Sequence, residues 1–226
     1  MILALVAFSS YRVLPREETY SLAFRPVVGQ VTKTSVAAVY KVGGPEVEVR
    51  YELRSEILKI ERDGTYRAKV AISSKSYREA DQLAIRNEAV DEWEASYNAR
   101  GEQLPDEESD EPEEDDPVND LMRLAVGYEP KSPVHLGESW TPPMDERLNL
   151  YPLKYTLVGI GPYQGHDELF LQGKGPGRDG ANLDVQVWLD AKTFASRRAV
   201  VHITEAPTRT GNDGDVLVTI ETKSAG

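Results

Sequence analysis

The chain has 226 residues, of which 40% are hydrophobic and 28% charged, and it contains no cysteine. The absence of cysteine excludes disulfide frameworks, thiolate zinc sites, iron-sulfur clusters and cysteine nucleophiles. The formal net charge is −12, from 26 basic and 38 acidic side chains, and the basic residues form no cluster of the kind that nucleic-acid binding requires. We therefore expect no nucleic-acid partner.

The first ten residues, MILALVAFSS, form the only strongly apolar run. The stretch from Ile2 to Phe8 is far shorter than the roughly 18 apolar residues that span a bilayer, so no transmembrane segment is expected. No lysine or arginine precedes it, but Ala7 and Ser9 are small residues at a spacing that suits cleavage. Residues 1–10 are thus either the remnant of an export signal or a buried N-terminal strand. An exported protein of the periplasm or cell envelope is expected, and a cytoplasmic one is not excluded.

Residues 20–73 carry a β pattern, because apolar and polar residues alternate with period two between turn signals. The apolar face of the second expected strand begins on odd-numbered residues, but Leu58 and Ile60 are apolar at even positions. This change of phase predicts a β-bulge near residues 55–57. Asp63-Gly64 predicts a hairpin. The inward-facing residues of the three expected strands are Val36, Ala38, Tyr40 and Val42; Val47, Val49, Tyr51 and Leu53; and Tyr66, Ala68, Val70 and Ile72.

Residues 80–96 have a different composition, rich in Ala, Glu, Asp, Gln, Leu and Arg. Leu83, Val90, Trp93 and Tyr97 recur at helical spacing, and Gly101 is available to end the segment. We predict a helix here, lying against the concave side of the sheet.

An acidic insert is expected at about 102–117. Asp106 to Asp116 contains nine carboxylates in eleven residues, and charges of one sign at this density repel each other and stay solvated. A flexible loop is predicted, which could bind a basic protein partner or collect divalent cations weakly. A short helix is predicted at 119–126.

The β pattern returns from Leu153 to the C-terminus, with turn chemistry at 173–180 and 211–214. The fold class predicted is mainly β: a single domain, 11–226, built as a curved antiparallel sheet or half-barrel of about eight long strands. The N-terminal and C-terminal halves should pair into one sheet. Its six candidate residues, for an apolar ligand or for the core, are Tyr51, Leu53, Val70, Val185, Val187 and Trp93.

The sequence offers no constellation for catalysis, a cofactor or a metal. His135, His166 and His202 are the only histidines, and none has another at ligand spacing. Lys174 is followed by Gly-Pro and a strand rather than by Ser or Thr and a helix, so 173–180 is predicted to be a hairpin turn and not a phosphate loop. The protein is therefore expected not to be an enzyme.

Four segments carry a resemblance to a known type of protein: Tyr20-Ser-Leu-Ala-Phe24, the stretch from Pro133 to Trp140, Tyr155-Thr-Leu157, and the stretch from Trp188 to Thr193. Together they resemble an uncharacterised family of exported bacterial proteins and lipoproteins. The resemblance implies a curved antiparallel sheet similar to that of the periplasmic lipoprotein carriers, and it brings no catalytic residues. This chain departs from the pattern in two ways, since it has no lipidation cysteine near its start and has Phe194 where a turn glycine is usual.

Two functions follow as expectations. In the first, the concave face is incompletely filled and binds a lipid or another apolar molecule in the cell envelope, which requires an apolar pocket with few polar groups. In the second, the concavity is filled and the protein is a structural or interaction module. Trp188 adds a local question, because period two places it opposite Val185 and Val187, so its strand must be covered on both faces or expose an aromatic ring.

Overall fold

The computed structural model describes residues 18–80, 85–87, 91–99, 101, 103–104, 129–142, 152–163, 165–177, 180–206, 211 and 213–224. The regular structure of this part of the chain is β, with no helix. The expectations for residues 1–10, for the acidic run at 106–116 and for a helix at 119–126 lie outside the described residues.

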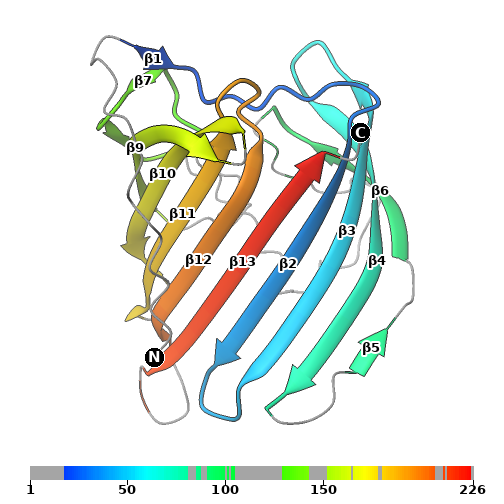
Figure 1. The fold of residues 1–226 in the computed structure, drawn as a ribbon, viewed down its shortest axis with the longest axis vertical. Coiled ribbons are helices and arrows are strands. Elements are labelled where there is room, and N and C mark those ends of the chain that lie inside the picture. Colours follow the sequence, from blue (N-terminus) through cyan, green and yellow to red (C-terminus); the bar gives the residue numbers. More distant parts are fainter. Residues whose placement is uncertain are drawn as a thin grey trace.

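One antiparallel sheet of eleven strands makes up the molecule's main body (Figure 1). Ten strands follow each other in the order β5-β4-β3-β2-β13-β12-β11-β10-β9-β8, β6 also pairs with β4, and β1 and β7 form a separate pair. The strands are β1 (Thr19–Tyr20), β2 (Val31–Lys41), β3 (Val47–Ile60), β4 (Tyr66–Glu79), β5 (Ile85–Asn87), β6 (Asp91–Tyr97), β7 (Val134–His135), β8 (Ser139–Trp140), β9 (Lys154–Tyr163), β10 (His166–Pro176), β11 (Asn182–Asp190), β12 (Ser196–Ala206) and β13 (Gly214–Ser224).

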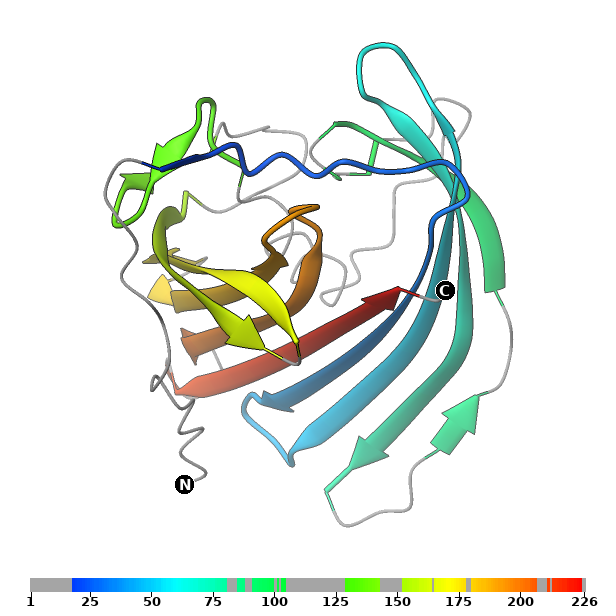
Figure 2. The ribbon, with the colours of Figure 1, turned by 45° about the horizontal axis from the view of Figure 1, so that its top comes forward.

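The predicted mainly-β, curved antiparallel sheet is confirmed (Figures 1 and 2). Eight strands, β2, β3, β4 and β9 to β13, have 9 to 14 residues each. The two halves of the chain join where β13 pairs with β2, with Val218 opposite Ala38. The halves therefore share one sheet, as expected from the sequence.

The helix predicted over 80–96 is wrong for the described part of that segment. Residues 91–97 form β6, which pairs with β4, and 85–87 form the short β5. Trp93 and Tyr97 fit helical spacing, but with Ala95 they also alternate, and they lie opposite Val70, Ala68 and Tyr66. The segment forms a strand because of ion pairs on the other face of the sheet, where Glu92 binds Lys69 at 2.7 Å and Glu94 binds Arg67 at 3.3 Å. Cross-strand pairs of this kind favour the sheet over local helix propensity.

The β-bulge in β3 lies slightly later than predicted. The register with β4 shifts between Ile57 and Lys59, so the additional residue is Leu58 rather than one of residues 55–57. Ile57 keeps the odd-numbered phase and is buried, Leu58 is exposed, and Ile60 returns to the inner side. The predicted inward position of Leu58 is wrong because the bulge uses that residue to reset the phase.

We call the side of the sheet that carries Val36, Ala38, Val218, Val201 and Val187 the inner face, since these residues lie in one cross-strand register. In its β9–β13 half most of the inward apolar side chains are buried, and those of Leu157, Leu171, Val187 and Val201 are fully so. Leu22, Val134 and Leu153, from segments outside the long strands, belong to the same core cluster and cover it. In Figure 2 the segment that follows β1 crosses the open side of the curved sheet.

Two positions show how closely the core is built. A Cβ on Gly173 would lie 2.6 Å from a ring carbon of Tyr155, so the glycine leaves room for that buried ring. Phe194 has a φ of +57°, the left-handed conformation for which glycine is usual. Phe194, which stands where a turn glycine is usual, therefore still adopts the backbone conformation of a glycine. Its ring packs against the core.

Candidate functional site

The structure places the six candidate residues on one sheet face but in two environments. Tyr51, Val185 and Val187 belong to the main core cluster, and the two valines are fully buried. Of the two roles considered for them, contact with an apolar ligand or a place in the core, these three residues have the second. Leu53 is half-buried at the edge of that cluster.

A less covered region occupies the inner face of β3, β4 and β6. We call it the inner-face patch and define it by Leu53, Val70, Ile72 and Trp93. Leu53 pairs with Ile72, and Val70 pairs with Trp93, which puts all four side chains on the same face. Val70 is buried, Leu53 and Ile72 are half-buried, and Trp93 is 37% exposed. Trp93 and the aliphatic side chains near it thus form a partly exposed apolar surface on this face.

One end of the patch is closed by aromatic rings. Tyr66 and Tyr97 stack with centroids 5.1 Å apart, and Phe24 meets Tyr66 edge-on at 5.9 Å. Burial raises the pKa of Tyr97 to about 12 and that of Tyr66 further, so both phenols stay neutral. The backbone N–H of Phe24 donates to Glu129 Oε1 at 2.9 Å, which fixes the crossing segment over this end.

The other end of the patch is polar and open. A second register shift in the β3–β4 pair, between Glu52 and Leu53, leaves Ser73 as the additional residue in β4. The shift turns Lys75 and Tyr77 to the inner face, opposite Tyr51 and Val49. Both side chains are exposed, and the Lys75 ammonium lies 5.0 Å from the centroid of the Tyr51 ring.

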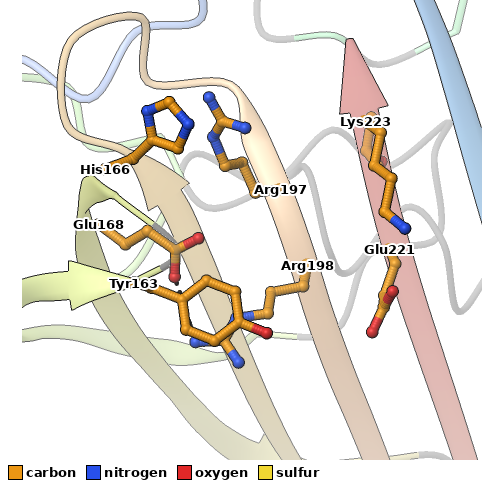
Figure 3. A pocket seen from close by; sticks show the side chains of 8 residues that line it. Tyr163, His166, Glu168, Arg197, Arg198, Glu221 and Lys223 are labelled. Atoms are coloured by element: carbon orange, nitrogen blue, oxygen red, sulfur yellow. Dashed lines mark hydrogen bonds and ion pairs between the residues drawn. The ribbon is translucent and has the colours of Figure 1, made fainter. Parts of the chain in front are cut away.

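The opposite, outer face carries a small hollow of about 110 Å³ between β10, β12 and β13 (Figure 3). At its base the Arg198 guanidinium lies 3.9 Å from the Tyr163 ring centroid and 4.3 Å from that of Trp188. Trp188 also stacks on Phe170 at 5.0 Å and is only 2% exposed. The strand is thus covered on both faces, which answers the question that Trp188 raised. The lining residues are Tyr163, His166, Glu168, Arg197, Arg198, Glu221, Thr222 and Lys223.

Glu168 and Arg198 form the buried ion pair of this hollow. Arg198 Nη2 donates to Glu168 Oε2 at 3.1 Å, and the Glu168 side chain is only 2% exposed. Burial raises the pKa of Glu168, and the neighbouring Arg198 limits the rise. The acid and the guanidinium bind one another, so this geometry holds the β9–β10 hairpin against β12.

Asp190 anchors the turn that joins β11 to β12. Its carboxylate accepts bonds from the backbone N–H groups of Lys192 and Thr193 at 3.0 and 2.9 Å and from Arg197 Nη2 at 2.6 Å. Burial alone would raise the pKa of Asp190, but these hydrogen bonds outweigh it and lower the pKa to about 2. The carboxylate is therefore charged in the folded protein at every ordinary pH.

The low pKa of Asp190 predicts a pH-dependent contribution to stability. Because the pKa falls from 3.8 to about 2 on folding, the charged form should stabilise the fold by about 2 kcal/mol above pH ~4 and lose this as the pH falls toward ~2. Urea titrations of Asp190→Asn and wild type should show that difference near pH ~6 and roughly half of it near pH ~3. An unchanged difference at the two pH values would contradict the assignment.

The described residues contain neither a metal-ligand cluster nor a membrane-spanning helix. In that part of the chain no three His, Asp or Glu side chains come together as metal ligands. The same residues include no helix with the length and apolarity needed to cross a bilayer.

The sequence pattern alone did not reveal Lys75, Tyr77 or the Glu168–Arg198 pair. Lys75 and Tyr77 follow a bulge that reverses the phase of β4, so simple alternation puts them on the wrong face. Glu168 of β10 and Arg198 of β12 are 30 residues apart in the sequence. Only the pairing of the strands in the sheet brings them together. The alternation of Glu92, Trp93 and Glu94 was the available signal for β6.

No protein-family model matches this sequence. None of the curated proteins matches it.

Solved structures do match, at low similarity. A chain of the Pseudomonas aeruginosa MucA/MucB complex is 14% identical with a TM-score of 0.27, covering 86% of this chain and 53% of that one, so the present chain spans about half of its length. A DUF1329 family protein from Desulfovibrio piger is 11% identical with a TM-score of 0.23, covering 87% and 85%. A LolA superfamily protein from Nitrosomonas europaea is 9% identical with a TM-score of 0.21, covering 90% and 88%. At these TM-scores, function has to be argued from the chain's own residues.

Proposed function

We propose that the protein is a non-enzymatic binding protein of the cell envelope that holds the acyl chain of a lipid on its inner-face patch. The observation that carries this proposal is Trp93, which is 37% exposed on the same sheet face as the buried core. Its direct neighbour in β4 is Val70, and Leu53 and Ile72 lie on the same face and are half-buried, so this part of the inner face is partly exposed to water. Covering it with methylene groups would gain about 0.8 kcal/mol per buried group.

The arrangement of the sheet supports this location over the rest of the inner face. The β9–β13 half is packed by Leu22, Val134 and Leu153, and its fully buried valines offer no surface to a ligand. The patch lies beyond this cover and is bounded by the Tyr66–Tyr97 stack at one end. The Trp93 ring offers a large, flat apolar area to one part of an acyl chain.

The filled half also supports the second candidate, a structural or interaction module of the envelope. Leu22 and Val134 are each 1% exposed and close part of the concave side with the chain's own residues. If segments of the chain fill the whole concavity in the same way, no ligand is needed. The two candidates differ in whether an acyl chain binds at all.

A pair of matched substitutions tests the proposal. Trp93→Glu places a charge on the patch, whereas Leu217→Glu does the same at a residue of similar exposure, 39%, on the outer face of β13. Titration calorimetry with palmitoyl lysophosphatidylcholine, below its micelle concentration, should show binding at least about tenfold weaker for Trp93→Glu, because a charge is costly to cover with an apolar chain. Leu217→Glu should bind as wild type does. If both variants bind the lipid with equal affinity, the inner-face patch is not the binding site. If wild type does not bind the lipid at all, the second candidate, a structural or interaction module with a filled concavity, is favoured.

A further inference from the structure

Lys75 is the cation at the open end of the inner-face patch. It lies in β4 directly opposite Tyr51, on the same face as Leu53 and Ile72. Its ammonium group is 5.0 Å from the centroid of the Tyr51 ring, a cation–π contact that holds the charge at the boundary between the apolar face and water. Lysine commonly lays its methylene stem on an apolar surface in this way and keeps the charge solvated.

Within the part of the chain that the structure describes, no acid pairs with Lys75, whereas its neighbours on the outer face form ion pairs. On the outer face of β3 and β4, Arg54 binds Glu56 at 3.2 Å and Lys69 binds Glu92 at 2.7 Å. Among the described residues no carboxylate lies within ion-pair distance of Lys75, whose one contact is the Tyr51 ring. The acids of β4 and β6 on the same face are Glu79, which pairs with Val47, and Asp91, which pairs with Ile72.

The spacing suits an amphiphile. The Lys75–Tyr51 pair, the Ile72–Leu53 pair and the Val70–Trp93 pair follow each other along β4 on one face. Two same-face steps along a strand cover about 13 Å. A chain lying over Trp93 and Ile72 therefore brings its headgroup to Lys75, at the open end, because the Tyr66–Tyr97 stack occupies the other end.

We infer that the ligand of the inner-face patch is an acyl lipid with an anionic headgroup, whose charge is met by Lys75. The inference rests on the proposed function and adds the class of headgroup to it. The net charge of −12 works against anions at long range. A preference for an anionic lipid therefore has to come from a local cation, and the described face offers Lys75.

The test compares two lipids that share a palmitoyl chain, anionic lysophosphatidylglycerol and zwitterionic lysophosphatidylcholine, by titration calorimetry on the full chain. Wild type should bind the anionic lipid about two- to fivefold more tightly, the range expected for one exposed ion pair. Lys75→Gln should abolish the difference by weakening the binding of the anionic lipid alone. Lys33→Gln, a matched change of an exposed lysine on the outer face of β2, should keep it. The preference should also shrink as salt rises, because the pair is exposed.

The outcomes separate the two proposals. Equal binding of both lipids by wild type, or an unchanged preference in Lys75→Gln, overturns the headgroup assignment and leaves the acyl-chain site intact. Absence of binding for both lipids overturns the site and the headgroup assignment together.

Discussion

Replacing Leu171 with alanine should lower the free energy of unfolding by about 2 to 5 kcal/mol. Leu171 is fully buried in β10 and lies between Leu157 of β9 and Val187 of β11, which are also fully buried. Both neighbours are fixed by the sheet ladders and cannot close around the cavity. The loss should therefore be near that of other rigid core sites rather than that of surface positions.

Leu53→Ala is the matched control, because it removes the same atoms from a half-buried position on the same face. The sequence alone predicts a large loss for Leu53 as well, but its partial exposure means that fewer contacts disappear. Urea unfolding curves for the two variants should show a clearly smaller loss for Leu53→Ala. A loss below about 1 kcal/mol for Leu171→Ala, or equal losses for both, would contradict the division of the inner face into a packed half and an open half.

Replacing Arg198 with methionine should cost about 3 kcal/mol at neutral pH, because it leaves the buried Glu168 carboxylate without its partner. The guanidinium also loses its contacts with the rings of Tyr163 and Trp188. Glu168 then becomes harder to ionise, so its pKa rises further. An acid whose pKa is raised on folding costs stability when it ionises, so the loss should be smallest at a pH below the ordinary value of 4.5 and should grow as the pH rises.

A second variant identifies the cause of that loss. Arg198→Met combined with Glu168→Gln has no buried charge to leave unpaired, so it should recover much of the stability lost by Arg198→Met alone. Chemical denaturation of wild type, the single variant and the double variant near pH ~7 provides the comparison. Equal stability of the single and double variants would show that ring packing, and not the carboxylate, causes the effect.

The long strands could be predicted from the sequence because each carries a regular alternation that one face of a sheet explains. Val185, Val187 and Leu189 of β11 are all inward and buried, as period two requires. The hairpin at Asp63-Gly64 also forms, with Gly64 at a φ of +89°. These features depend on local sequence, which a single chain displays directly.

The candidate site was less predictable because its residues depend on register. The sequence predicts a helix where β6 forms, because Trp93 and Tyr97 fit both periods and the ion pairs that decide between them involve residues of β4. Lys75 reaches the inner face only through the bulge at Ser73, where no glycine or proline marks a change of phase. The residue type of Trp93 makes it a candidate, but its strand and its neighbour Val70 follow only from the register with β4.

The central claim is that an acyl chain lies on the inner face of β3, β4 and β6, and photo-crosslinking tests it most directly. A palmitoyl lipid with a diazirine in its chain, irradiated with the full protein and followed by peptide mass spectrometry, should label the segments around Leu53, Val70 to Ile72 and Trp93. Unlabelled lipid in excess should compete the labelling away. Labelling of β9 to β13 instead, or labelling that excess lipid does not reduce, would contradict the account.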